Sequence, residues 1–124
     1  MTSARNVLGT ALVPCSFDPL TGFHRDGCCH TDGQDAGSHV ICAKVTVGFL
    51  NQQMERGNDL ITPRPEMRFR GLQPGDRWCV CAVRWREALA DGRAPPVVLE
   101  ATHERALEFV SLDVLKAHAL STVS

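Results

Sequence analysis

The sequence predicts an α+β fold: one compact domain with a small sheet, three or four short helices and a long ordered loop rich in Cys, His and Gly. The length of 124 residues suits a single domain with its own core. Segments with strand-like and helix-like apolar patterns are both present. Residues 18–42 show almost no such pattern, yet they hold three of the five histidines and three of the six cysteines. We therefore expect one domain over residues 1–124, with an ordered core at about 6–119.

The N-terminal half is expected to contain a strand, the loop and a helix. Residues 6–13 are mostly apolar and predict a strand that a glycine interrupts. Residues 15–39 contain the turn-forming pairs Asp-Pro, Thr-Gly and Asp-Gly, which predict the loop. From Val40 the apolar spacing of three and four residues predicts a helix that begins near Ser38 and ends at Gly57.

The C-terminal half is expected to contain the best strand of the chain. Residues 59–76 carry three prolines and two glycines and predict an extended surface loop. Residues 77–85 are apolar on both faces, which predicts a central strand covered on both sides. The remaining segments are a short helix, a buried strand, a helical turn capped by Thr102 and a last helix capped by Ser111, at about residues 84–90, 97–100, 102–109 and 111–119.

Composition excludes several classes of partner. The formal net charge is −1, there is no run of like charges, and aromatic residues are few, so we expect no nucleic acid partner. No apolar segment is long enough to cross a bilayer, so we expect no membrane partner. The first sixteen residues lack the apolar region of a secretory signal, which favours a cytoplasmic location. In a reducing cytoplasm, six cysteines are more often thiols or metal ligands than disulfides.

The loop supplies candidate zinc ligands, namely Cys28, Cys29, His30, His39 and Cys42. Zinc requires four nitrogen or sulfur ligands, and such a set can be chosen here, although the spacing matches no standard zinc motif. Two alternatives remain open. The cysteines, including Cys79 and Cys81, can be small buried hydrophobic residues, or they can form disulfides, for which six cysteines allow fifteen pairings. The loop aspartates, Asp26, Asp32 and Asp35, lack the pattern of a calcium loop and are expected to form turns.

The same loop supplies candidates for catalysis. Cys28 or Cys29 could act as a nucleophile with a loop histidine as base, and Arg25 could lower the thiol pKa. His103 is a third candidate, because it follows a predicted buried strand at the start of a helical turn. We expect the loop to fold back onto residues 75–81 and to form one pocket with residues 102–104. The candidate pocket residues are Arg25, Asp26, His39, Asp76, Arg77, Trp78, Arg84, Thr102, His103 and Glu104.

Several sequence blocks resemble a bacterial family known as domain of unknown function 2237. The blocks are NVLGTALVPCSFDPLTGFHRDGCC, GSHVICAKVT, GNDLITPRPE, GLQPGDRWCVCAVRWREA and APPVVLEATHERALEFVSLDVLKAHA. The resemblance implies a compact α+β domain and no known activity. Residues characteristic of the family pattern are Cys15, residues 25–29, His39, Cys42, residues 57–59, Pro63, residues 75–79, residues 84–85 and residues 102–104. The chain departs from the pattern at residues 47–48 and 67–70.

Three functional hypotheses follow from these features. The first is a cytoplasmic domain whose pocket, lined by thiols and imidazoles, binds a small ligand or a metal, with zinc as the candidate cofactor. The second is a protein-interaction module without catalysis, in which the Cys-rich loop has a structural role. The third is a thiol-dependent enzyme, which requires one cysteine to be far more reactive than the others.

Overall fold

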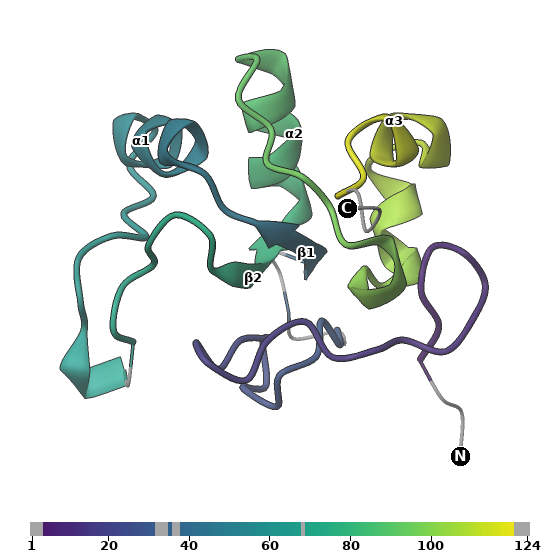
Figure 1. The fold of residues 1–124 in the computed structure, drawn as a ribbon, viewed down its shortest axis with the longest axis horizontal. Coiled ribbons are helices and arrows are strands. Elements are labelled where there is room, and N and C mark those ends of the chain that lie inside the picture. The colour runs from purple at the N-terminus through teal and green to yellow at the C-terminus, as the bar shows by residue number, and fades with distance from the viewer. Residues whose placement is uncertain (1–3, 32–34, 36–37, 68, 121–124) are drawn as a thin grey trace.

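The structure is a computed structural model that describes residues 4–31, 35, 38–67 and 69–120. A two-stranded antiparallel sheet, β1 (His39–Lys44) and β2 (Arg77–Cys81), lies at the centre of the molecule. Figure 1 shows the helices on one side of this sheet and the N-terminal residues on the other. The small sheet and the three helices among the described residues, α1 (Val47–Glu55), α2 (Ala82–Ala90) and α3 (Leu112–Ala117), confirm the predicted α+β class.

The prediction of a helix from residue 38 onward is wrong for its first part. Residues 39–44 form β1, and α1 begins only after Thr46, whose hydroxyl oxygen accepts a hydrogen bond from the Phe49 N–H at 3.1 Å. Val40 to Ala43 are all buried, and a short apolar run of this kind suits a strand as well as a buried helix. Pairing with β2 decides between the two, because it satisfies the backbone of both segments.

The predicted strand over residues 77–85 is too long. β2 ends at Cys81, and α2 starts at Ala82 without a break in the chain. Among the described residues β2 pairs only with β1, so it is not central in a larger sheet. Trp85 lies on α2 with its side chain fully buried, and its indole N–H donates to the Pro95 carbonyl at 3.1 Å. A helix therefore covers the sheet where the sequence predicted an extension of the strand.

The predicted first strand, at residues 6–13, is also absent among the described residues. Asn6 closes a tight loop instead: its side-chain oxygen accepts from the Leu8 and Thr10 N–H groups, and its amide donates to the Ala11 and Glu100 carbonyls. An asparagine that binds nearby backbone groups offers the chain an alternative to a sheet ladder. Only isolated bridges remain, Arg5 with Ala11 and Asn6 with His103.

The C-terminal region is closer to the prediction. Ser111 caps α3 by accepting a hydrogen bond from the Val114 N–H, as predicted. The buried strand predicted at residues 97–100 is reduced to bridges of Val97 with Ala43 and Ala119, and a 3-10 turn follows at Leu99–Ala101. The next turn, Glu104–Glu108, is capped by His103 rather than by Thr102.

Two apolar clusters form the interior. The larger lies between the sheet and the helices, around Phe49 and Trp85. The smaller lies on the other side, under the N-terminal residues, and consists of Cys15, Cys29, Cys42, Cys79 and Ala101.

Within the described part of the chain, none of the helices has the length and apolar character needed to cross a membrane. Short 3-10 turns, including Pro65–Met67, lie in the segments between the helices and strands.

Candidate functional site

Two disulfides attach the N-terminal segment, residues 4–31, to the sheet. They join Cys15 to Cys42 and Cys29 to Cys79. Cys42 and Cys79 are direct partners across β1 and β2, so the bonds hold two points of the segment on one face of the sheet. This is one of the alternatives that the sequence left open, and it differs from the expectation that the cysteines are thiols.

The five predicted zinc ligands do not form one ligand set in this structure, because Cys29 and Cys42 are bonded to other cysteines. Among the residues that the structure describes, two groups of side chains could nevertheless hold a metal. The ligand atoms of Asp26, Cys28 and His30 lie within 4.8 Å of one another near the surface. The sulfurs of Cys15, Cys29 and Cys79 also lie within 4.8 Å of one another, but disulfide bonds occupy them here.

Cys28 is a poor candidate for a nucleophile. Burial raises the pKa of its thiol, and the charge of Asp26 raises the pKa further. The expected lowering of the thiol pKa by Arg25 therefore does not occur. A thiol with a raised pKa is less ionised at neutral pH, and the thiolate is the reactive form. Cys29, the other candidate, has no thiol in the disulfide form.

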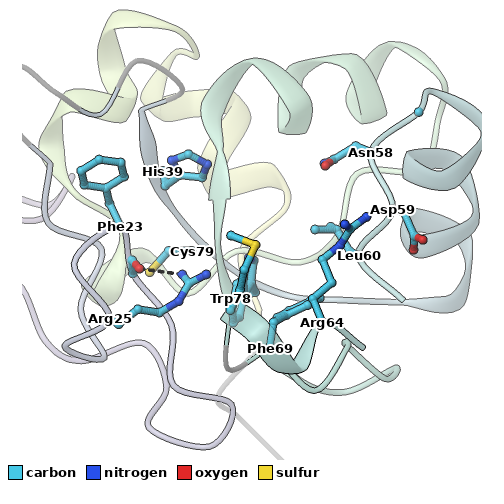
Figure 2. Close-up of a pocket in the computed structure, with 13 residues that line it drawn as sticks. Phe23, Arg25, His39, Asn58, Asp59, Leu60, Arg64, Phe69, Trp78 and Cys79 are labelled. Atoms are coloured by element: carbon cyan, nitrogen blue, oxygen red, sulfur yellow. Dashed lines mark hydrogen bonds between the residues drawn. The ribbon is translucent and has the colours of Figure 1, made fainter. Parts of the chain in front are cut away.

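An open cavity of about 510 Å³ lies beside the disulfide between Cys29 and Cys79. Figure 2 shows residues from four parts of the chain around it, at 22–25, 39, 57–69 and 78–79, with Trp78 and Phe69 between the two sides. Its lining residues are Gly22, Phe23, Arg25, His39, Gly57, Asn58, Asp59, Leu60, Arg64, Met67, Phe69, Trp78 and Cys79. The cavity therefore combines a histidine, two arginines and several aromatic rings.

His39 is held by a buried aspartate. Its ring nitrogen Nδ1 lies 2.6 Å from Oδ1 of Asp35, and its backbone N–H donates to Oδ2 at 2.8 Å. The Asp35 side chain is fully buried, whereas that of His39 is 40% exposed. Burial by itself raises the pKa of Asp35, but the hydrogen bonds and charge of His39, with the Thr31 hydroxyl, outweigh it and hold the pKa below its ordinary value. Asp35 thus orients an accessible imidazole, beyond the turn-forming role that the sequence predicted.

Arg25 and Trp78 form one wall of the cavity. The Arg25 guanidinium lies 5.0 Å from the centre of the Trp78 ring, and it donates to the Gly22 carbonyl at 2.8 Å. Arg25 has a φ of 54°, a left-handed conformation that is uncommon for a residue with a side chain. Gly22 must be glycine, because a Cβ there would collide with the Cys28 carbonyl oxygen. The segment is therefore shaped so that the guanidinium lies over the indole.

The opposite wall comes from the residues after α1. The Asn58 amide donates to the buried Gln53 side chain at 2.7 Å, which fixes the start of this wall. The hydroxyl of Thr62 and the N–H groups of Ile61 and Thr62 bind Asp59 and lower its pKa, so this carboxylate is used by the loop. Figure 2 shows Arg64 on the same side, across the cavity from Arg25.

The cavity brings together only three of the ten predicted pocket residues, Arg25, His39 and Trp78. Asp26 lies near the surface beside Cys28, and Arg77 is exposed at the start of β2. The others have partners away from the cavity: Asp76 accepts from the Gln73 N–H, Arg84 pairs with Glu87, and the Thr102 hydroxyl accepts from the Cys42 N–H. His103 and Glu104 line a separate hollow with Thr31. Asp32 lies outside the described residues.

His103 is half-buried, and its imidazole accepts a hydrogen bond from the Arg105 N–H at Nδ1. Burial lowers its pKa and outweighs the raising effect of Glu104. The unfolded chain therefore binds this proton more readily, so the stability that the neutral ring contributes is complete above a pH of about 6.5 and is lost as the pH falls below it.

We accordingly expect the free energy of unfolding to decline between pH 7 and 5, and to decline less in His103→Asn. Asparagine also accepts the capping hydrogen bond but does not titrate in this range. Urea unfolding at a series of pH values measures the difference. Identical slopes for the wild type and the variant would contradict this assignment.

Reasoning from the sequence missed Asp35 as the partner of His39 and the whole wall from Gly57 to Phe69. The spacing of four residues between Asp35 and His39 was a usable signal, as was the unusual Gly-Asn-Asp block at residues 57–59. Neither signal indicates which part of the chain lies opposite, because the contact depends on the pairing of β1 with β2 and on the disulfides.

Fold and site together define a small α+β protein, crosslinked by two disulfides, with an Asp–His pair at an arginine- and aromatic-lined cavity. The chain belongs to the family described as "Uncharacterized protein conserved in bacteria (DUF2237)", whose sequence profile matches residues 5–119. The resemblance seen in the sequence is thereby confirmed. A search of curated proteins found no match.

Proposed function

We propose that this protein binds a small anionic molecule with an aromatic or apolar part in the cavity, and that His39 exchanges a proton with it. The single observation that carries this proposal is the imidazole of His39, oriented by buried Asp35 at a cavity that also contains two arginines. Cavities of this size, mainly apolar and with a few convergent polar groups, are typical of small-molecule sites.

The charges favour an anion. Arg25 and Arg64 line the cavity, and the one carboxylate among its described lining residues, that of Asp59, already accepts two backbone N–H groups. Guanidinium groups bind carboxylates and phosphates through strong, charge-assisted hydrogen bonds. The rings of Phe69 and Trp78, whose centres lie 5.3 Å apart, offer an apolar surface for the rest of the ligand.

The Asp–His pair supports a proton transfer. Asp35 has a lowered pKa and is ionised at neutral pH, so it favours the tautomer of His39 with its proton on Nδ1. The other ring nitrogen, Nε2, is then the atom that meets a ligand and accepts a proton from it. The left-handed Arg25 is consistent with this site, because strained residues cluster where ligands bind.

A metal ion is a second candidate ligand, supported by the proximity of Asp26, Cys28 and His30. Three such ligands leave one position of a tetrahedral zinc ion open. The raised pKa of Cys28 weakens this candidate, since zinc binds the thiolate. The raised pKa of Cys28 also weakens the thiol-enzyme hypothesis, since the thiolate is the reactive form.

A cytoplasmic location remains part of the proposal, and in that compartment the disulfides would face a reducing environment.

The test is a calorimetric titration of the full-length protein with phenyl phosphate, and with benzyl alcohol as the neutral analogue. We expect phenyl phosphate to bind at least about tenfold more tightly, because a charge-assisted hydrogen bond contributes roughly 1.5–3 kcal/mol. Arg64→Gln should remove most of that advantage. His39→Gln should reduce the number of protons exchanged with buffer on binding, which titrations in buffers of different ionisation enthalpy measure.

Arg93→Gln is the matched control, because Arg93 pairs with Glu55 in a different hollow and does not line the cavity. It should bind phenyl phosphate as the wild type does. Equal binding of the neutral and anionic probes, or equal losses in Arg64→Gln and Arg93→Gln, would overturn the proposal.

A further inference from the structure

Four buried sulfur atoms lie together on the side of the sheet away from the helices. Cys29 and Cys42 are fully buried, Cys79 is 1% exposed and Cys15 is 5% exposed. The sulfurs of Cys15, Cys29 and Cys79 are mutually within 4.8 Å, and the Cys42 sulfur is bonded to that of Cys15. The two disulfides thus form one sulfur cluster, enclosed by the apolar residues Ala101 and Val98.

Backbone hydrogen bonds hold Cys15, Cys42 and Cys79 independently of the sulfur–sulfur bonds. Cys42 and Cys79 face each other across β1 and β2, and their N–H groups donate to the hydroxyls of Thr102 and Thr21. The Cys15 N–H donates to the Gly27 carbonyl, close in sequence to Cys29. In the folded chain with reduced disulfides, these contacts favour the same arrangement of the four thiols.

We infer that the reduced protein binds one zinc ion through Cys15, Cys29, Cys42 and Cys79. In a tetrahedral site with four thiolates the sulfurs lie about 3.8 Å apart, as follows from zinc–sulfur bonds of about 2.3 Å. Three of the sulfurs here are already within 4.8 Å of one another, and the Cys42 sulfur, which is bonded to that of Cys15, has to approach those of Cys29 and Cys79 to complete the site. The site is closed and has no position for a substrate, so it is structural.

Conversion of the two disulfides into a zinc site requires a reductant, for which we take a dithiol. Each disulfide accepts two electrons and two protons from a dithiol, which is oxidised to its own disulfide, so two dithiols convert the two bonds into four thiols. Zinc then displaces the four thiol protons to solvent and forms four zinc–sulfur bonds. The two disulfides and the zinc site are thus alternative crosslinks between the N-terminal segment and the sheet.

The test uses the full-length protein, reduced with a water-soluble phosphine under anaerobic conditions, and titrated with Co²⁺ and then Zn²⁺. We expect one Co²⁺ per chain, with the sulfur-to-cobalt charge transfer and the visible bands of a tetrahedral thiolate site. Zinc should displace it and remove the colour. The oxidised protein should not develop these bands, and circular dichroism of the reduced protein should show the native spectrum once zinc is bound.

Variants locate the site. Cys42→Ser should weaken metal binding by well over about tenfold, since even a change in the outer shell of a metal site costs 10–100-fold. Cys81→Ser, a change just outside the cluster, should leave the affinity and stoichiometry unchanged. Where Cys42→Ser does not fold, Cys15→Ser from the N-terminal segment provides the same measurement.

Two outcomes would overturn the inference. The first is a reduced wild-type protein that binds no metal, whether it is folded or unfolded. The second is binding that survives Cys42→Ser and Cys15→Ser but is lost in Cys28→Ser, which would assign the metal to Asp26, Cys28 and His30 near the surface. Neither outcome affects the binding of phenyl phosphate by the oxidised protein, so the two proposals are tested separately.

Discussion

Removal of the bond between Cys29 and Cys79 is expected to lower the free energy of unfolding of the oxidised protein by about 4 kcal/mol. This bond closes a loop of 50 residues, and the entropy of an unfolded chain with a loop of that length gives about this value. Small domains have a total stability of about 5–15 kcal/mol, so this bond accounts for roughly a quarter to four fifths of the total. The measurement is urea unfolding of Cys29→Ser in a Cys28→Ser background.

The background is needed because the neighbouring thiol of Cys28 could otherwise replace Cys29 in the bond with Cys79. Cys28→Ser alone is the control, and we expect it to stay within about 0.5 kcal/mol of the wild type, as do most substitutions outside the core. If adding Cys29→Ser to this background changed nothing, Cys29 would not be crosslinked in the purified protein. A count of two reactive thiols in the denatured wild type would show that four of the six cysteines are crosslinked.

The elements that the sequence predicted well are those with local signals. Ser111 precedes an apolar pattern with helical spacing, and it caps α3 through its own hydroxyl. The apolar residues after Asp76 predict β2 because successive side chains face the helices and the N-terminal segment in turn. Such signals depend on a few neighbouring residues, so they predict the element correctly without knowledge of its distant contacts.

The elements that the sequence predicted wrongly are decided by distant contacts. Val40 to Ala43 form a strand because β2 lies beside them, and nothing within residues 38–50 indicates that partner. In residues 6–13 the side chain of Asn6 makes the decisive hydrogen bonds, one of them to Glu100. No local pattern of residues predicts a contact between positions so far apart in the sequence.

The candidate site divides in the same way. Residue chemistry indicated Arg25, His39 and Trp78, because an arginine, a histidine and a tryptophan in such surroundings suggest a ligand. The cysteine pairing was not accessible, since fifteen pairings were possible and the backbone geometry chooses one. His103 looked equivalent to His39 in the sequence, but it lies in a different hollow, and only the structure separates the two.

Trp85→Ala is expected to lower the free energy of unfolding by about 3–5 kcal/mol, the usual range for a large aromatic side chain removed from a core. Trp85 is fully buried, its ring packs edge-on against His118, and its indole N–H donates to the Pro95 carbonyl. Alanine leaves both a cavity and an unpaired carbonyl oxygen. Urea unfolding followed by circular dichroism measures the loss, because the substitution also removes a fluorophore.

Trp85→Phe separates packing from hydrogen bonding. It keeps most of the ring volume and loses the hydrogen bond to Pro95, so it should cost roughly 1–3 kcal/mol. Because Trp85 does not line the cavity, the folded Trp85→Phe protein should bind phenyl phosphate as the wild type does. Trp78→Leu, in contrast, should weaken binding of phenyl phosphate. Trp78 lines the cavity, and the Arg25 guanidinium lies over its ring. If both variants lost affinity equally, the cavity would not be an independent site, and the sheet would transmit core packing to His39.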